Sequence, residues 1–263
     1  MWSAILLVTA ALLCGATAWA QPALYLIGDS TVRNGGGEGG NGQWGWGEPL
    51  AGYFDPEKLH MVNRAIGGRS SRTFWTEGRW DRVLEELKAG DFVLMQFGHN
   101  DGGPLDDNSR ARGTLPGIGE EIREIDNPIT KKHEVVHTYG WYLRRFIADT
   151  KAKGATPIMC TLVPRKTWRD GHIIRNKATD AGWAEDVART AGIPVLDLNE
   201  IIARRYDELG AERVEPLFGD EHTHTNRAGA ELNAACVVEA LKALPENPLA
   251  PFFSERVRGV ASQ

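Results

Sequence analysis

A serine follows directly after an apolar run near the start of the chain. Residues 23–27, Ala-Leu-Tyr-Leu-Ile, predict a buried strand, and the sequence Gly-Asp-Ser-Thr at 28–31 places Ser30 just beyond its carboxyl end. In open α/β sheets, ligands bind at the carboxyl ends of parallel strands. Asp and Ser are also common caps of the helix that follows a strand, so this tetrapeptide alone does not identify a nucleophile.

Three further polar clusters, each beside a predicted strand end, give Ser30 a chemical context. A serine hydroxyl becomes a strong nucleophile when a base removes its proton. We expect His224 to be that base, because the helix predicted to begin at Asn226 places it on a loop near the sheet edge. The clusters are Gly67-Gly68-Arg69-Ser70, Gly98-His99-Asn100-Asp101 and Asp220-Glu221-His222-Thr223-His224.

The acid that orients His224 is predicted to be Glu221, three residues before it. That spacing lets a carboxylate fold back within one turn and hold the imidazole nitrogen that faces away from the serine. Such an acid selects the tautomer of the histidine and stabilises the imidazolium. Asp220 is the alternative for this role.

Attack on an ester carbonyl generates an oxyanion, which needs hydrogen-bond donors fixed in advance. Three candidates follow from the clusters: the backbone N–H groups of Ser30 and Gly68 and the side-chain amide of Asn100. Glycine suits this role because a residue without Cβ lets the backbone approach a ligand closely. Of the nearby polar residues, Asp29 is expected to satisfy backbone donors around the serine, and His99 to pack behind its loop.

The chain of 263 residues carries a net charge of −5 and has no basic cluster, which argues against nucleic-acid binding. Residues 1–20 have no charged side chain and contain an apolar stretch before Ala18-Trp19-Ala20, which predicts a cleaved secretory signal peptide and a periplasmic or secreted protein. A membrane anchor is the alternative. Residues 21–263 are expected to form one domain, a monomer without membrane contact. Cys160 and Cys236 are expected to be buried free thiols, with a disulfide as the alternative.

Strands and helices alternate along the chain. Apolar runs predict parallel strands, and stripes of apolar residues at helical spacing predict helices over residues 139–153 and 226–244. Residues 172–191 and 199–209 are also predicted to be helices. The expected fold is a three-layer α/β/α sandwich with a central parallel five-stranded sheet. Residues 33–43 and 102–134 are predicted to be loops, which either help to build the site or are solvated loops without a function. The five predicted strands are residues 23–27, 59–63, 91–97, 156–163 and 193–198.

The four polar blocks resemble those of the SGNH (GDSL-like) hydrolases, and most closely the rhamnogalacturonan acetylesterases. The segments that carry the resemblance are residues 28–31, 63–72, 98–101 and 222–225, with 139–143 and 163–165 also similar. The resemblance extends from about residue 24 to 244 and implies a flavodoxin-like fold. It also implies a serine esterase that removes acetyl groups from rhamnogalacturonan and needs no cofactor or metal. Where the family usually has aspartate three residues before the histidine, this chain has Glu221.

Aromatic and basic residues near the predicted strand ends are candidates for substrate binding. Indole rings stack on sugar faces, and guanidinium groups match the geometry of uronate carboxylates. Core packing and surface ion pairs are the alternatives for these residues. The candidates are Trp44, Trp46 and Trp168 for stacking, and Arg69, Arg72 and Arg165 for carboxylates.

The sequence therefore predicts that His224 activates Ser30. Ser30 then takes an acetyl group from an acetylated pectic polysaccharide and forms an acetyl-enzyme. One alternative keeps this chemistry on another substrate, such as acetylxylan, a lipid ester or another short-chain ester. A second is a carbohydrate-binding protein that has no catalytic activity. A third is a metal-dependent hydrolase built on the His-x-His pair of His222 and His224.

Overall fold

The computed structural model describes residues 21–34 and 41–259. The predicted signal peptide, residues 1–20, lies outside the described residues, as does part of the predicted glycine-rich loop, residues 35–40. Within the described part, no helix is both long and apolar enough to cross a membrane.

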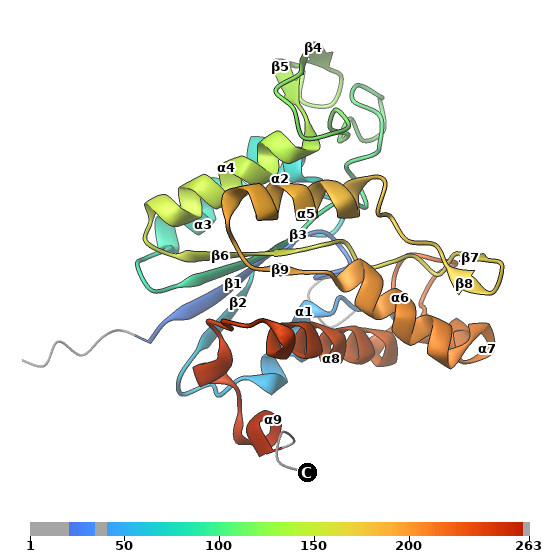
Figure 1. Cartoon of the computed structure of the whole chain (residues 1–263). Coiled ribbons are helices and arrows are strands. Elements are labelled where there is room, and N and C mark those ends of the chain that lie inside the picture. The colour runs from blue at the N-terminus through green and yellow to red at the C-terminus, as the bar shows by residue number, and fades with distance from the viewer. Residues whose placement is uncertain (1–20, 35–40, 260–263) are drawn as a thin grey trace, which may run out of the picture.

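A parallel sheet forms the centre of the described structure, with strand order β2-β1-β3-β6-β9. Helices cover both of its faces, which confirms the predicted α/β/α architecture (Figure 1). Because the strands are parallel, their carboxyl ends meet at one edge, where three of the polar blocks follow β1, β2 and β3. The fourth block, residues 220–224, follows a 3-10 turn and reaches this edge through the contact of His224 with Ser30. The strands are β1 (Ala23–Gly28), β2 (His60–Asn63), β3 (Phe92–Gln96), β6 (Thr156–Cys160) and β9 (Val195–Leu196).

The helices divide between the two faces of the sheet (Figure 1). On one face lie α2 (Ser71–Thr76), α3 (Arg79–Glu86), α4 (Tyr139–Ala152) and α5 (Asp180–Ala191). On the other lie α1 (Gly47–Leu50), α6 (Leu198–Leu209), α7 (Ala211–Val214), α8 (Arg227–Ala243) and α9 (Glu255–Gly259). Single 3-10 turns occur at Ala51–Tyr53, Glu215–Leu217 and Ala250–Phe252.

Strand β1 shows how the apolar run serves both layers. All six of its residues are buried, and successive side chains point to opposite faces of the sheet. Leu24 and Leu26 belong to the core beneath α6 and α8, whereas Tyr25 and Ile27 belong to the core beneath α3 and α4. Full burial of such a side chain stabilises the fold by about 1.5–3 kcal/mol. This is why the strand is apolar throughout rather than alternating.

Two long helices begin at polar caps. The Thr138 hydroxyl accepts a hydrogen bond from the N–H of Trp141 at 3.1 Å, and α4 begins at the next residue. The Asn226 side chain accepts from the N–H of Gly229 at 3.1 Å and caps α8, as predicted. Cys160 and Cys236 are both buried and free, which confirms the prediction of free thiols.

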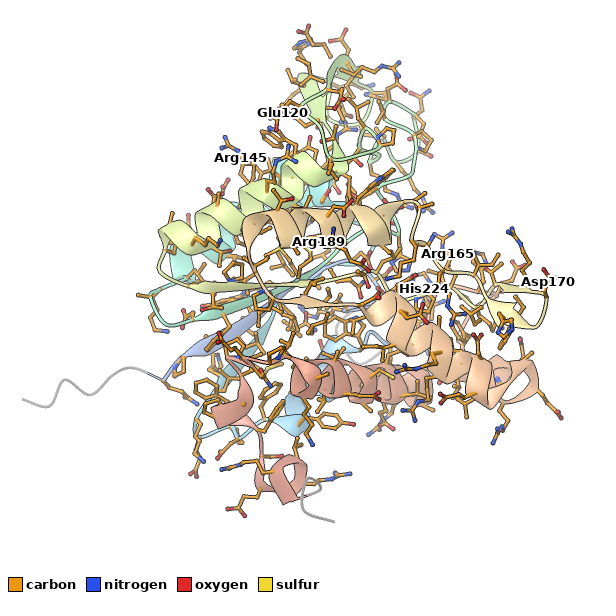
Figure 2. The ribbon with its side chains drawn as sticks, viewed as in Figure 1. Glu120, Arg145, Arg165, Asp170, Arg189 and His224 are labelled. Atoms are coloured by element: carbon orange, nitrogen blue, oxygen red, sulfur yellow. The ribbon has the colours of Figure 1, made fainter. Side chains whose placement is uncertain are left out.

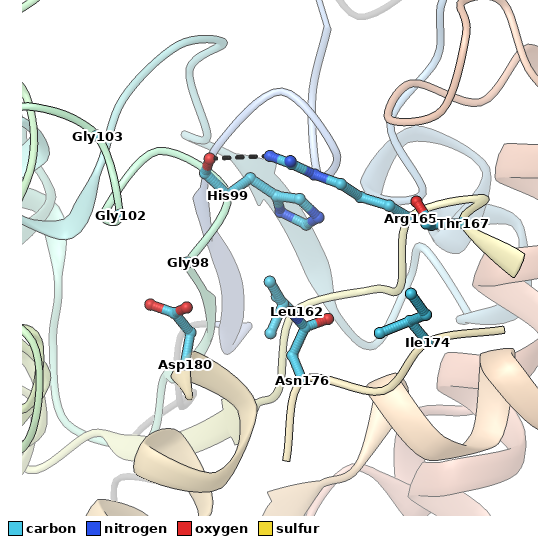
Figure 3. Close-up of a pocket in the computed structure, with 10 residues that line it drawn as sticks. All are labelled: Gly98, His99, Gly102, Gly103, Leu162, Arg165, Thr167, Ile174, Asn176 and Asp180. Carbon is cyan, nitrogen blue, oxygen red and sulfur yellow. Dashed lines mark hydrogen bonds between the residues drawn. The ribbon is translucent and has the colours of Figure 1, made fainter. Parts of the chain in front are cut away.

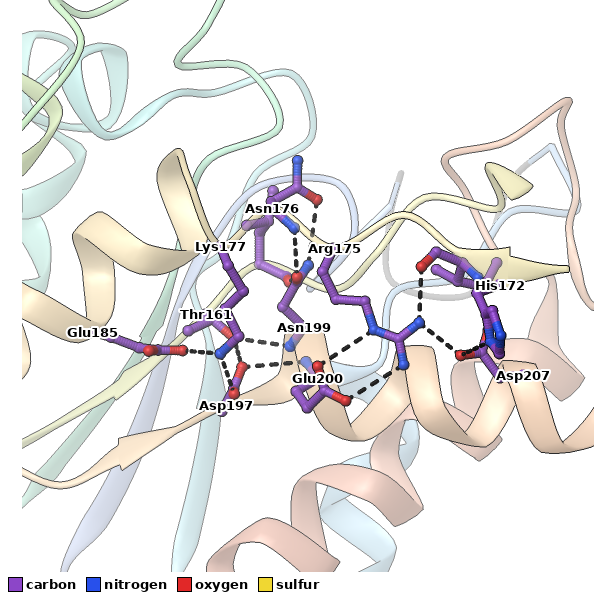
Figure 4. A network of polar contacts seen from close by, with 12 residues as sticks. Thr161, His172, Arg175, Asn176, Lys177, Glu185, Asp197, Asn199, Glu200 and Asp207 are labelled. Carbon is purple, nitrogen blue, oxygen red and sulfur yellow. Dashed lines mark hydrogen bonds and ion pairs between the residues drawn. The ribbon is translucent and has the colours of Figure 1, made fainter. Parts of the chain in front are cut away.

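The prediction of a helix over 172–191 is wrong in its first part. Residues 168–173 form a hairpin of β7 (Trp168–Arg169) and β8 (His172–Ile173), and α5 begins only at Asp180. Polar contacts hold this segment against α6, as Figure 4 shows. Arg175 contacts Asp207 at 2.6 Å and Glu200 at 3.3 Å, and the N–H of Asn176 donates to the Asn199 side chain at 2.8 Å. These contacts replace the local helical hydrogen bonds that the pattern predicted.

The segment 102–134 was predicted to be a loop, but its second half contributes to a hairpin of β4 (Ile122–Asn127) and β5 (Lys132–His137). In β4 only Ile125 and Asn127 are buried, so the strand lacks the apolar signal that would predict it. Arg72 anchors this hairpin. Its fully buried guanidinium contacts both carboxylate oxygens of Glu134, at 2.6 and 2.8 Å, and donates to the carbonyl of Gly113 at 2.8 Å. Arg72 is therefore a structural residue and not a ligand for a uronate.

Candidate active site

Ser30 lies in a tight turn at the carboxyl end of β1. The buried carboxylate of Asp29 accepts hydrogen bonds from the N–H of Thr31 at 2.9 Å and from its hydroxyl at 2.8 Å, while the N–H of Val32 donates to the Asp29 carbonyl at 3.2 Å. A Cβ on Gly28 would lie 2.5 Å from the Gln96 carbonyl oxygen, so only glycine fits where the turn begins. The turn thus holds Ser30 in one place, with Asp29 serving backbone donors as predicted.

The structure brings Ser30 and His224 together. The Ser30 Oγ lies 2.8 Å from Nε2 of His224, although 194 residues separate them in the chain. The other ring nitrogen of His224, Nδ1, lies 2.5 Å from Oδ2 of Asp220. The hydroxyl, the imidazole and the carboxylate therefore form a continuous chain of hydrogen bonds, which is the arrangement of a serine hydrolase triad.

The contacting acid is Asp220, and the prediction of Glu221 is wrong. The Glu221 side chain is 94% exposed, and its Oε2 lies 3.9 Å from Nδ1 of His222. Asp220 turns back on its own loop because Oδ1 accepts from the N–H groups of His222, Thr223 and His224 at 3.1, 2.8 and 2.9 Å. Hydrogen bonds from the next few backbone N–H groups to an Asp side chain are a local turn motif that aspartate commonly forms.

These contacts also determine the charge of Asp220. Partial burial acts to raise its pKa, but hydrogen bonds from the backbone N–H groups of His224 and Thr223 and from the His224 ring outweigh burial and lower the pKa below the usual aspartate range. Asp220 is therefore ionised at neutral pH. A negative charge at this position stabilises the imidazolium that forms when His224 accepts a proton.

The three predicted oxyanion donors lie around the same cavity. Ser30, Gly68, Asn100 and His224 all line a cavity of about 350 Å³. The backbone N–H groups of Ser30 and Gly68 donate to no acceptor within the described residues. The Asn100 amide donates one hydrogen bond to the Arg69 carbonyl at 2.9 Å, and its second N–H remains for a ligand. Gly68 has φ +77°, a conformation that favours glycine.

A buried carboxylate joins the loops that carry these donors. Asp101 is 1% exposed and accepts from the N–H of Ser71 at 2.9 Å, from the Ser71 hydroxyl at 2.5 Å and from the N–H of Gly98 at 3.0 Å. It ties the loop of Asn100 to the start of α2, three residues after Gly68. Burial raises the pKa of Asp101 to about 7, despite the hydrogen bonds from Ser71 that oppose this.

His99 lies behind the catalytic loop, as predicted. Its Nδ1 lies 3.2 Å from Oδ2 of Asp29, and its Nε2 lies 3.0 Å from the Val163 carbonyl oxygen. Burial acts to raise the pKa of Asp29, but the charge of His99 and hydrogen bonds from His99 and Thr31 lower it below the usual range. The imidazole thus braces the serine turn against the loop after β6.

The predicted substrate residues separate into two groups. Arg165 lines the Ser30 cavity, and Figure 2 shows it near His224 beside the β7–β8 hairpin. Arg69 does not, because Glu77 holds it at 3.0 Å in a neighbouring cavity. Three tryptophans also lie away from the cavity: Trp44 lies under Arg227, Trp46 is buried and donates to Gln96, and Trp168 lines a separate surface cavity.

Two arginines that the sequence analysis missed complete the cavity. Arg110 and Arg112 come from the segment after β3 and line the Ser30 cavity together with Arg165. Arg112 donates to the Gly68 carbonyl at 3.0 Å, which helps to position that glycine. None of these three arginines forms an ion pair with a carboxylate in the described part of the chain. The sequence could have indicated them, because both are basic residues in the long segment that follows the polar block of residues 98–101.

Comparison with known proteins agrees with this geometry. A family model described as the GDSL-like lipase/acylhydrolase family matches residues 26–232. The chain belongs to this family. It is therefore a carboxylic ester hydrolase of SGNH architecture. No group of three or more His, Cys, Asp or Glu side chains within residues 21–34 and 41–259 is arranged to hold a metal ion.

Three relatives illustrate the similarity. The esterase is 33% identical over 219 residues to a rhamnogalacturonan acetylesterase of Emericella nidulans, covering 83% of this chain and 84% of that protein. It is 31% identical over 226 residues to a Bacillus subtilis protein named "probable rhamnogalacturonan acetylesterase YesY", covering 84% and 93%. The solved structure of YxiM from Bacillus subtilis superposes with a TM-score of 0.67 at 27% identity. That match covers 84% of this chain and spans 56% of the YxiM chain.

Proposed function

We propose that this esterase removes O-acetyl groups from an acetylated pectic polysaccharide, rhamnogalacturonan in particular. The observation that carries the proposal is the set of three arginines, Arg110, Arg112 and Arg165, around a serine within hydrogen-bond distance of a histidine. Pectic backbones contain uronate residues, and a guanidinium binds a carboxylate through two parallel hydrogen bonds. The two relatives named as rhamnogalacturonan acetylesterases support the same substrate class.

The first half of the reaction forms an acetyl-enzyme. Nε2 of His224 accepts the proton of Ser30 as Oγ attacks the acetyl carbonyl carbon. The carbonyl oxygen becomes an oxyanion, which the N–H groups of Ser30 and Gly68 and the Asn100 amide stabilise. The bond between the carbonyl carbon and the sugar oxygen then breaks, and the imidazolium gives its proton to the departing sugar hydroxyl.

The second half releases acetate. A water molecule gives a proton to His224 and attacks the acetyl carbon, and the same donors stabilise the second oxyanion. Collapse of this intermediate breaks the bond to Ser30 Oγ, which takes back the proton from the imidazolium. Asp220 keeps Nδ1 of His224 protonated throughout. These steps use only side chains and backbone groups of the chain and one water molecule.

The location of the reaction is part of the proposal. An acetylated polysaccharide of a plant cell wall is outside the cytoplasm, and the composition of residues 1–20 predicts export of this chain. We therefore place the esterase in the periplasm or outside the cell. Sequencing the amino terminus of the protein recovered after expression tests this, with Gln21 expected as the first residue.

Acetate release from three substrates tests the function: acetylated rhamnogalacturonan, acetylxylan without uronate side groups, and an aryl acetate. Arg110→Ala and Arg165→Ala are expected to lower kcat/KM on rhamnogalacturonan about tenfold or more relative to acetylxylan, because a hydrogen bond to a charged group contributes about 1.5–3 kcal/mol. Arg189→Ala removes a surface arginine on α5 and is the matched control. The proposal of a uronate substrate is contradicted if the wild-type enzyme has the same kcat/KM on acetylxylan as on rhamnogalacturonan and neither arginine substitution changes this ratio.

A further inference from the structure

Three successive backbone carbonyls around the oxyanion donor Gly68 each accept a hydrogen bond from a side chain. Arg69 Nη1 donates to the Gly67 carbonyl at 3.1 Å. Arg112 Nη1 donates to the Gly68 carbonyl at 3.0 Å. The side-chain amide of Asn100 donates to the Arg69 carbonyl at 2.9 Å. Side chains thus hold both of the peptide units that flank Gly68.

The contact that Arg69 makes determines the direction of the Gly68 N–H. This peptide unit lies beside the nucleophile, because Gly67 and Gly68 line the Ser30 cavity and a Cβ on Gly67 would lie 3.6 Å from Ser30 Cβ. The Gly67 carbonyl and the Gly68 N–H belong to one planar trans unit, so they point in opposite directions. Hydrogen bonding of the carbonyl also polarises the unit and strengthens its N–H as a donor. Arg69 therefore holds the carbonyl on one side and, through it, the N–H on the other.

Arg69 is itself held by Glu77 at the end of α2. Its Nε donates to Oε2 of Glu77 at 3.0 Å. A capping box, in which Ser70 and Thr73 exchange hydrogen bonds, fixes the start of α2 directly after Arg69. The side chains of Arg69 and Glu77 are 33% and 34% exposed, so this ion pair adds little to the stability of the fold. Its main effect is to restrict where the guanidinium lies.

Arg165 makes a similar contact on the loop of Asn100 but remains open to a ligand. Figure 3 shows its guanidinium at the His99 carbonyl oxygen, 3.3 Å away. Arg165 also lines the Ser30 cavity, where a ligand can reach it. Arg69 lines a different cavity, and its guanidinium is already engaged by a carboxylate and a carbonyl. Contact with substrate is therefore available to Arg165 and not to Arg69.

We propose that Arg69 is a positioning residue for catalysis: it orients the Gly67–Gly68 peptide so that the Gly68 N–H meets the developing oxyanion. The inference rests on the Ser30 reaction of the proposed function but not on the identity of the polysaccharide. The oxyanion forms only as the reaction proceeds and is absent from the bound ester. Loss of Arg69 should therefore lower kcat and leave KM nearly unchanged.

Hydrolysis of an aryl acetate by Arg69→Met tests this role. Complete loss of an oxyanion donor lowers kcat by about 10²–10³-fold, and Arg112 still holds part of the turn, so we expect a loss of about ten- to a hundredfold. KM should stay within about twofold of the wild-type value. Arg64→Met is the matched control, because Arg64 lies in the same segment and pairs with Glu86 in a similarly exposed ion pair, with exposures of 45% and 42%. It should change neither kcat nor KM.

A double-mutant cycle with Gly68→Ala separates positioning from a general structural effect. Gly68→Ala displaces the same N–H, so adding Arg69→Met to it should lower kcat by less than about threefold more. Independent effects would multiply instead. The positioning role is overturned if Arg69→Met causes the same fold-loss of kcat with and without Gly68→Ala, if it raises KM at unchanged kcat, or if it leaves both constants at the wild-type values.

A second variant covers the case in which Arg69→Met is unfolded at the assay temperature, as measured by circular dichroism. Glu77→Gln keeps Arg69 and weakens its anchor, so it should lower kcat about threefold or more at unchanged KM; an unchanged kcat overturns the inference. If Ser30→Ala keeps the wild-type activity, the Ser30 reaction fails and this inference fails with it. If the wild-type enzyme hydrolyses the aryl acetate but no pectic substrate, only the proposed substrate fails.

Discussion

Replacing Asp220 with asparagine exchanges one carboxylate oxygen, the one that contacts His224, for an NH₂ group. In the structure, Oδ1 of Asp220 accepts from three backbone N–H groups, and Oδ2 lies 2.5 Å from Nδ1 of His224. An asparagine can keep its oxygen on the three backbone donors. Its NH₂ group then faces Nδ1, which must become an acceptor, so the ring proton moves to Nε2. With Nε2 protonated, His224 can no longer accept the proton of Ser30.

The expected loss of kcat is large because His224 carries its ring proton on Nε2 in nearly every molecule of the variant. The same substitution in a serine protease triad lowers kcat about 10⁴-fold. A 10⁴-fold loss corresponds to about 5 kcal/mol in activation free energy. The free energy of unfolding should change much less, since the loop that Asp220 closes keeps its three backbone hydrogen bonds.

Hydrolysis of an aryl acetate at neutral pH measures this loss directly, because the small substrate uses only the Ser30 cavity. Glu221→Gln is the matched control: it makes the same chemical change one residue away, on a side chain that is 94% exposed. It should keep kcat/KM within about twofold, as is usual for an exposed side chain. Thermal unfolding of both variants separates catalytic loss from misfolding. The reasoning is refuted if Asp220→Asn keeps a tenth of the activity, or if Glu221→Gln loses as much.

Three further predictions follow from the surrounding contacts. Gly68→Ala should lower kcat on the aryl acetate by roughly ten- to a thousandfold, because a residue with Cβ resists φ +77° and displaces an oxyanion donor; Gly192→Ala, at φ +60° on the end of α5, should lower stability alone. Arg72→Met should lower the free energy of unfolding by about 3–5 kcal/mol in urea titrations, because it leaves Glu134 unpaired, and Glu134→Gln in the same chain should restore part of it. The pKa of Asp101 is about 7 in the folded protein and near 4 in the unfolded chain, so its contribution to stability is full below pH 4 and is lost as pH rises through 7. The stability difference between wild type and Asp101→Asn, measured by urea unfolding at pH 5 and pH 8, should therefore shift in favour of the variant at pH 8, and no shift would contradict the raised pKa.

The sequence alone predicted the sheet and most of the catalytic groups. Continuous apolar runs such as residues 23–27 identify strands buried on both faces, and a polar block follows directly after several of them. Parallel strands bring their carboxyl ends to one edge, so Ser30, Gly68 and Asn100 had to come close together once the strands were identified. His224 followed from its place on a loop before a capped helix.

Tertiary structure decided the contacts that depend on how a loop turns or on what covers a side chain. The positions of Asp220 and Glu221 differ by one residue, and only the path of the loop shows which of them faces His224. Arg72, from one of the segments that resemble the SGNH hydrolases, is buried in a structural ion pair, whereas Arg112, from a segment without periodicity, lines the active site. Spacing along the sequence shows only which residues are neighbours in the chain. The ion-pair partner of a long charged side chain instead depends on which residues the tertiary fold brings within contact distance of it.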